Sequence, residues 1–108
     1  MAVPIFHDYL LQNAATTGNG TAVDFEGQLR ELAIYIIWSA GVSAGAIQVE
    51  TADATDYTGT WSALHPAPVT FTASKQDTVM ISGILKALRA RISTNIVGGT
   101  VTVKLYAN

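Results

Sequence analysis

The chain has 108 residues, of which 49% are hydrophobic and only 13% charged, so it can supply the core of one small domain. Six Lys and Arg against eight Asp and Glu leave a net charge of −2, without the basic excess that binding to phosphates requires. We therefore expect no nucleic-acid partner, and the absence of cysteine excludes disulfides, thiolate metal sites and a thiol nucleophile.

The N-terminal residues 1–16 are expected to form an arm. The opening MAVPIFHDYLL has no basic start and carries His7 and Asp8 within its apolar stretch, so it does not resemble a signal peptide. No apolar run approaches the length that spans a bilayer, and we expect no membrane partner. The turn-rich stretch 12–21 separates the arm from a single domain over residues 17–108.

Arg30 to Trp38 is the clearest strand of the chain, because its apolar residues recur with a period of two. One face also carries Tyr35 and Ile37, so we expect that face to be covered by the arm or by a neighbouring subunit. The opposite face holds Leu32, Ile34, Ile36 and Trp38.

The next strand is expected over Ala46 to Thr51, with Ile47 and Val49 inward and the intervening Gln48 and Glu50 outward. A polar loop follows, and a short apolar segment after it contains a tryptophan. Prolines then confine the connection to further short strands, because proline cannot donate to a sheet ladder. These segments are the loop 52–59, the apolar segment 60–64, and the strands 69–72 and 78–82.

The segment Gly83 to Ser93 is ambiguous. Its apolar residues could line a helix, but they also alternate with Arg89 and Arg91 as in a strand. We favour a strand, because the flanking segments are rich in β-branched residues and the sheet would otherwise lack a strand. Residues 100–107 alternate cleanly and predict the last strand.

The pattern predicts an all-β fold, a β-sandwich or jelly roll of about eight strands with an N-terminal arm. Such a sandwich has exposed sheet edges, and this chain has few charged residues to block pairing there. Edge pairing between subunits would cover them.

Residue types that could support catalysis are present but scattered. His7 and His65 lie far apart without neighbouring carboxylates at ligand spacing, and no segment shows a nucleophile elbow. We expect no enzyme activity, no metal and no cofactor.

The loop 52–59 leaves two binding roles open. Asp53 and Asp56 with Glu50 could supply oxygen ligands for calcium, although the EF-hand spacing is missing and an Asp-rich turn is the favoured interpretation. Tyr57 and Trp61 could form a platform for sugar stacking, but a place in the core is favoured for Trp61.

Arg89 and Arg91 would project from one face of their strand. They could form bidentate pairs with acidic residues of a partner subunit, or pair within the chain with a residue such as Glu50 on an adjacent strand. The sequence leaves both alternatives open.

Three segments together resemble small virion proteins of tailed phages: TGNGTAVDFEG at 17–27, IQVETADATDYTGTWSAL at 47–64, and KALRARISTNIVGGTVTVKLYAN at 86–108. The resemblance implies a capsid decoration (cement) protein on the virion surface, made in the cytoplasm of a bacterial host. It also implies a homo-oligomer, most simply a trimer, that bridges major capsid proteins. A collar or tail protein, or a carbohydrate-binding module for host recognition, is the alternative.

The expected partners are therefore the major capsid protein and further copies of this chain. The candidate interface residues come from the arm, from the second face of the clearest strand and from the arginine pair. They are Val3, Ile5, Phe6, Tyr9, Leu10, Tyr35, Ile37, Arg89 and Arg91.

Overall fold

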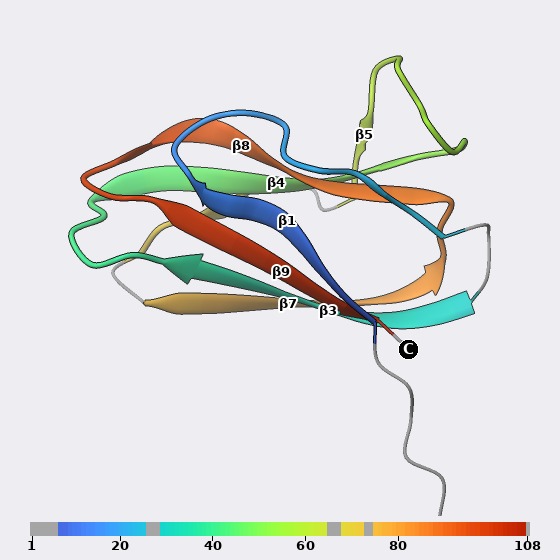
Figure 1. Ribbon diagram of the computed structural model, residues 1–108, viewed down its shortest axis with the longest axis horizontal. Helices are drawn as coiled ribbons and strands as arrows, with labels where there is room; N and C mark the ends of the chain where they lie inside the picture. The colour runs from blue at the N-terminus through green and yellow to red at the C-terminus, as the bar shows by residue number, and fades with distance from the viewer. Residues whose placement is uncertain (1–6, 26–28, 65–67, 73–74, 108) are drawn as a thin grey trace, which may run out of the picture.

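The computed structural model describes residues 7–25, 29–64, 68–72 and 75–107. These residues form nine strands (Figure 1) and no helix, so none of them belongs to a helix that could cross a bilayer. The strands are β1 (His7–Ala15), β2 (Val23–Asp24), β3 (Leu29–Trp38), β4 (Ala44–Ala52), β5 (Ser62–Ala63), β6 (Val69–Thr70), β7 (Gln76–Ile84), β8 (Ala87–Val97) and β9 (Val101–Ala107).

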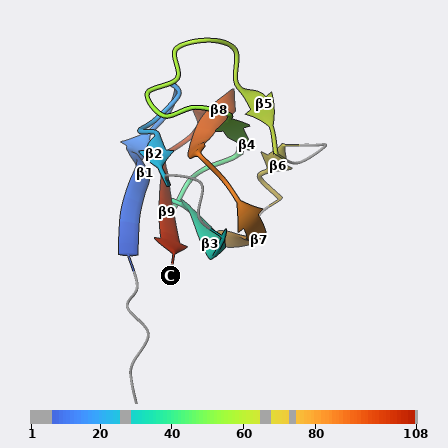
Figure 2. The same cartoon turned by 90° about the vertical axis from the view of Figure 1, so that its right-hand side faces the viewer.

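The strands form two antiparallel sheets, seen in two views in Figures 1 and 2. Sheet A has the order β1-β9-β3-β7, and sheet B has the order β2-β8-β4-β5, with β6 also pairing with β4. The prediction of an all-β chain is thus confirmed in the form of two antiparallel sheets.

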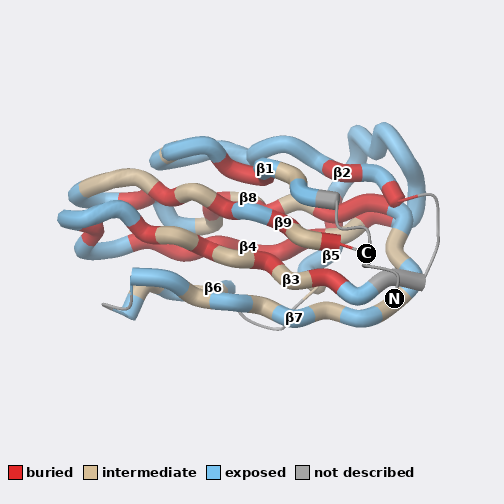
Figure 3. The backbone as a smooth tube through the Cα atoms, turned by 60° about the horizontal axis from the view of Figure 1, so that its bottom comes forward, coloured by how far each residue is buried: buried red, intermediate tan, exposed pale blue. Residues whose placement is uncertain are grey.

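One apolar core takes side chains from both sheets. Alternation places every second residue of a strand on the same face, and Ile34, Ile47 and Leu105 are completely buried there. Burying a side chain of this size stabilises the fold by about 1.5–3 kcal/mol. In Figure 3 the buried stretches follow β3, β4, β8 and β9, while β7 alternates between exposed and half-buried positions.

The second half of the expected arm is part of the domain. From His7 to Ala15 the chain pairs with β9 as an edge strand of sheet A, and Leu11 is only 1% exposed. The buried amide of Gln12 donates to the carbonyls of Gly18 at 3.2 Å and of Ala90 at 2.7 Å, which joins this edge to sheet B. The expected arm over residues 1–16 is therefore corrected for residues 7–15, whose backbone pairs with β9 of the same chain.

The linker between β1 and β2, residues 16–22, connects the edge of sheet A to strand β8 of sheet B. The pairing of β1 with β9 shifts register twice, and Ala14 has a φ of 48°. The linker then runs along β8, where Ile92 N donates to Gly18 O at 3.0 Å and Ile96 N donates to Thr16 O at 2.9 Å. Bulges and covering segments of this kind prevent an edge from pairing with another chain.

The ambiguous segment 83–93 forms β-structure and no helix, as favoured, but the prediction of one strand over the whole segment is wrong, because a turn divides it between two strands. β7 ends at Ile84, residues 85–86 make the connection, and β8 begins at Ala87.

The prediction that Gln48 and Glu50 point outward needs a correction in one respect. Both lie on the face of β4 away from the core, but they are only 7% and 5% exposed because the chain covers this face.

Candidate interaction surfaces

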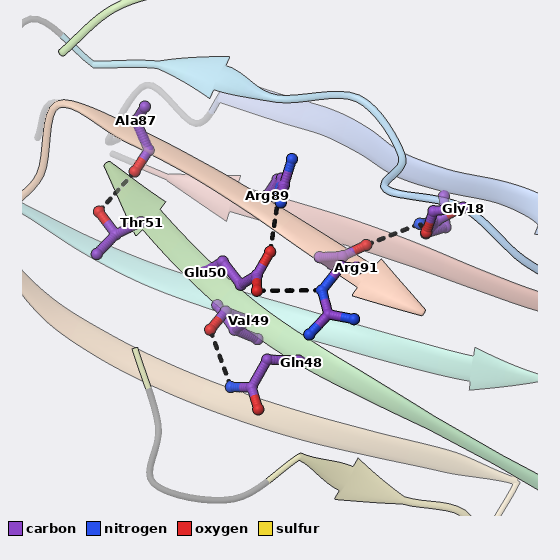
Figure 4. Close-up of polar contacts among 10 residues, drawn as sticks. Gly18, Gln48, Val49, Glu50, Thr51, Ala87, Arg89 and Arg91 are labelled. Atoms are coloured by element: carbon purple, nitrogen blue, oxygen red, sulfur yellow. Dashed lines mark hydrogen bonds and ion pairs between the residues drawn. The ribbon is translucent and has the colours of Figure 1, made fainter. Parts of the chain in front are cut away.

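The outer face of sheet B is organised around one buried carboxylate, that of Glu50 (Figure 4). Arg89 Nε donates to Oε1 at 2.8 Å and Arg91 Nε donates to Oε2 at 3.1 Å, so both oxygens are engaged. The register of β4 with β8 places Glu50 directly opposite Arg89. The arginines therefore pair within the chain, which is the second of the two alternatives that the sequence left open.

Trp61 covers this ion-pair cluster. The Arg89 guanidinium carbon lies 4.5 Å from the centre of the Trp61 ring, and Trp61 packs with Ala52 and Ala87 in a small cluster separate from the main core. A cation held over an indole face and sheltered from water is favourable. The favoured prediction that Trp61 is buried is confirmed, at 9% exposure, but its place is on the outer face of sheet B.

This geometry bears on the two binding roles suggested for the loop 52–59. Glu50 is held by two arginines, and no cluster of three or more His, Cys, Asp or Glu that could hold a metal ion occurs in the described part of the chain. Tyr57 stands edge-on to Trp61, with ring centres 6.0 Å apart and an interplanar angle of 71°. Because Arg89 lies over a face of Trp61, the two rings do not form an open platform for a sugar.

The outer face of sheet A has no comparable covering among the described residues. Register places Ala33 between Tyr106 on β9 and Met80 on β7, and Tyr35 between Lys104 and Thr78. The Tyr35 and Tyr106 rings meet edge to face with centres 5.6 Å apart. Met80 is 71% exposed, which is unusual for so large an apolar side chain.

Ala33, Tyr35 and Met80, with their neighbours on β9, line an open groove of about 610 Å³ on sheet A. Its charged residues are Glu31 and Lys104, and its floor is apolar and aromatic. We call this the sheet A groove; it is lined by Glu31, Leu32, Ala33, Tyr35, Ile37, Gln76, Met80, Lys104, Tyr106 and Ala107. A smaller hollow of about 190 Å³ adjoins it at Lys104 and Tyr106 and extends to Asp8, Tyr9 and Leu10 on β1. An apolar concave face with few charges is suited to contact with another protein.

The structure divides the predicted interface residues between two faces. Tyr35 and Ile37 line the sheet A groove, and Leu10, 44% exposed, lies beside it. Tyr9 packs toward the core, edge-on to Phe25 at 6.2 Å. Arg89 and Arg91 lie on sheet B and are used within the chain, and the predicted residues Val3, Ile5 and Phe6 lie outside the described residues.

Met80 and Tyr106 belong to the groove but are missing from the predicted interface. Alternation in the strands 78–82 and 100–107 puts each of them on the face opposite the core. The alternation pattern does not indicate the strand order, which places β7 and β9 on either side of β3.

No protein-family model matches this chain, and no curated protein does. Among solved structures, the fold is similar to the crystal structure of the SPBc2 prophage-derived protein YomS, with a TM-score of 0.66 and 22% sequence identity. The similarity covers 99% of this chain and 96% of that one. At this level of identity the likeness establishes a shared fold.

Proposed function

We propose that this chain is a structural protein of a phage particle that binds the major capsid protein through the sheet A groove. It acts as an oligomer and stabilises the capsid by bridging neighbouring capsid proteins. The observation that carries the proposal is the apolar groove around Tyr35, Ile37 and Met80, on a sheet face that no described segment covers. The resemblance of three sequence segments to tailed-phage virion proteins and the fold shared with a prophage-derived protein support it.

We also propose a more specific fold class for the two sheets. We assign the two sheets to a β-sandwich of the jelly-roll type, as the resemblance to virion accessory proteins implies. The core shared by both sheets supports this assignment. The trimer that the resemblance implies is one of the oligomers to be tested by light scattering.

The experiment is co-sedimentation of the purified chain with capsids from which it has been omitted. We expect Ile37→Asp to weaken capsid binding by about tenfold or more, because it puts a charge into an apolar contact. Thr58→Asp is the matched control, since it adds the same charge at an exposed loop position away from the groove, and we expect it to bind as the parent does. Equal binding of both variants, with both folded by circular dichroism, would refute the role of the groove.

A place in the collar or tail is the alternative position for the same role. Co-sedimentation with purified tails and not with capsids would support it. A carbohydrate-binding role for the loop 52–59 receives less support, because Trp61 is buried and Arg89 lies over its ring. Saturable binding on a glycan array that Tyr57→Ala abolishes would favour that role instead.

A further inference from the structure

One edge of sheet A is a long, regular strand with an unpaired side. β7 pairs with β3 from Leu29↔Ile84 to Ile37↔Gln76 without a register shift, and no described strand lies on its other side. This contrasts with the opposite edge of sheet A, where the pairing of β1 with β9 shifts register twice. An edge that is long, straight and regular is a template for pairing with another strand.

The backbone groups that face outward on this edge can be assigned from one hydrogen bond. Trp38 N donates to Lys75 O at 3.0 Å, so the odd-numbered residues that follow point their backbone N–H and C=O groups at β3. The even-numbered residues point theirs away from the sheet. These are Gln76, Thr78, Met80, Ser82 and Ile84.

The side chains of β7 do not protect the edge. The strand contains no lysine or arginine, and its one acidic residue, Asp77, accepts a hydrogen bond from Trp38 Nε1 at 2.7 Å. Met80 and Ile84 are 71% and 68% exposed. Asp77 is the one charged residue of this strand, and its carboxylate is engaged by Trp38, so the outward-facing positions of β7 carry no charge.

We propose that β7 pairs antiparallel with β7 of a second copy, with Met80 opposite Met80 across a twofold axis. This register uses every outward-facing backbone group of the strand, because Thr78 then pairs with Ser82 and Gln76 pairs with Ile84 of the other copy. On the core-side face, Val79 meets Ile81. Asp77 meets Gly83, so no like charges are opposed.

The β7 pairing makes the oligomer of the proposed function a dimer. The role of this dimer in bridging capsid proteins rests on that proposed function. A twofold axis perpendicular to a continuous sheet keeps both outer faces on the same side. The two sheet A grooves would then lie side by side, each with Met80 at its inner rim, and face one surface together. Such a pair binds two neighbouring capsid proteins at once, and it replaces the trimer implied by the resemblance.

The first measurement is the mass of the full-length chain in solution by light scattering, from about 1 to 500 μM. We expect twice the chain mass of 11.4 kDa at the upper concentrations. Thr78→Pro removes an N–H that points away from β3 and leaves the β3 ladder intact, so it should raise the dimer dissociation constant about tenfold or more. Thr78→Ala keeps the N–H and should dimerise as the parent does.

The register is tested by single cysteines, since the chain has none of its own. Met80→Cys places two thiols at paired positions, about 5.5 Å apart between Cα atoms, and should form a disulfide-linked dimer on mild oxidation. Ile84→Cys is the matched control with similar exposure, because its two copies would be about 27 Å apart along the strands. It should remain monomeric on denaturing gels.

A monomer or a trimer at every concentration overturns the pairing, as does a Thr78→Pro variant that dimerises like the parent. Cross-linking of Ile84→Cys as fast as Met80→Cys overturns the register. None of these measurements involves capsids, so the pairing and the capsid role fail separately. A dimer that does not bind capsids refutes the proposed function alone. A monomer that binds them through the groove refutes the pairing and the bridging, and leaves the groove as the capsid-binding surface.

Discussion

The outer face of sheet B is covered by its own chain, with Trp61 over Arg89 and both arginines on Glu50. The outer face of sheet A carries Tyr35, Ile37 and Met80 around an open groove. Both faces begin from similar alternating strands, but the loop between β4 and β5 rises on the outer side of sheet B (Figure 2), and no described segment covers sheet A in the same way. Polar and charged residues on a strand can thus lie on a buried face, while apolar residues lie on an open one.

The largest effect should follow from breaking the cluster on sheet B. Glu50→Ala leaves two guanidinium groups close together without their shared carboxylate, and we expect the free energy of unfolding to fall by about 3 kcal/mol. Urea denaturation measures this. Asp53→Ala, which removes an exposed carboxylate from the neighbouring loop, should change it by less than about 0.5 kcal/mol. Similar losses for both variants would mean that the cluster does not hold the face together.

Removing the Trp61 ring should lower the free energy of unfolding by less than removing the Glu50 carboxylate does. Trp61→Ala takes away the ring that packs on Arg89, Ala52 and Ala87 outside the main core, and we expect the free energy of unfolding to fall by about 2 kcal/mol. Amide hydrogen exchange should also become faster in residues 53–60. The matched control is Tyr57→Ala. Because Tyr57 is 38% exposed, its loss should lower the free energy of unfolding clearly less. Equal costs would show that the two rings contribute alike to closing sheet B.

The smallest effect on stability is expected on sheet A. Ile37→Thr changes a half-buried side chain on the open face and should alter the free energy of unfolding by about 0.5 kcal/mol or less. Ile36→Thr, one residue earlier and completely buried, should cost about 2–4 kcal/mol by the same measurement. A large cost at Ile37 would indicate that its contacts serve the fold, and the contrast between the two faces would then disappear.

Several strands could be predicted from the sequence, because alternation in segments such as Arg30 to Trp38 and 100–107 reports directly which side chains are buried, whereas β1 was assigned to an arm. The expectation that Gln48 and Glu50 face solvent followed the same rule, and here it was incomplete. Alternation gives the face of a residue but not whether another segment covers it. The cover comes from Trp61 and from the arginines of β8, which only the tertiary pairing brings together.

The prediction of the candidate site was incomplete for a related reason. Tyr35 and Ile37 were found because they lie on the second face of an obvious strand. Met80 and Tyr106 join them only through the order β9-β3-β7, which no local pattern contains. Likewise, an apolar start such as Tyr9 to Leu11 indicates that a segment will pack, but not whether it packs on its own chain or on another one.

The position of β9 has a consequence for how the protein is made. This strand lies between β1 and β3, so the middle of sheet A is supplied by the last of its four strands to be synthesised. Until β9 has left the ribosome, β1 has no neighbour in its sheet and β3 can pair only with β7. Sheet A therefore closes by contacts between strands that lie far apart in the chain, and such long-range closure is slow. Assembly into any larger structure has to wait for that step.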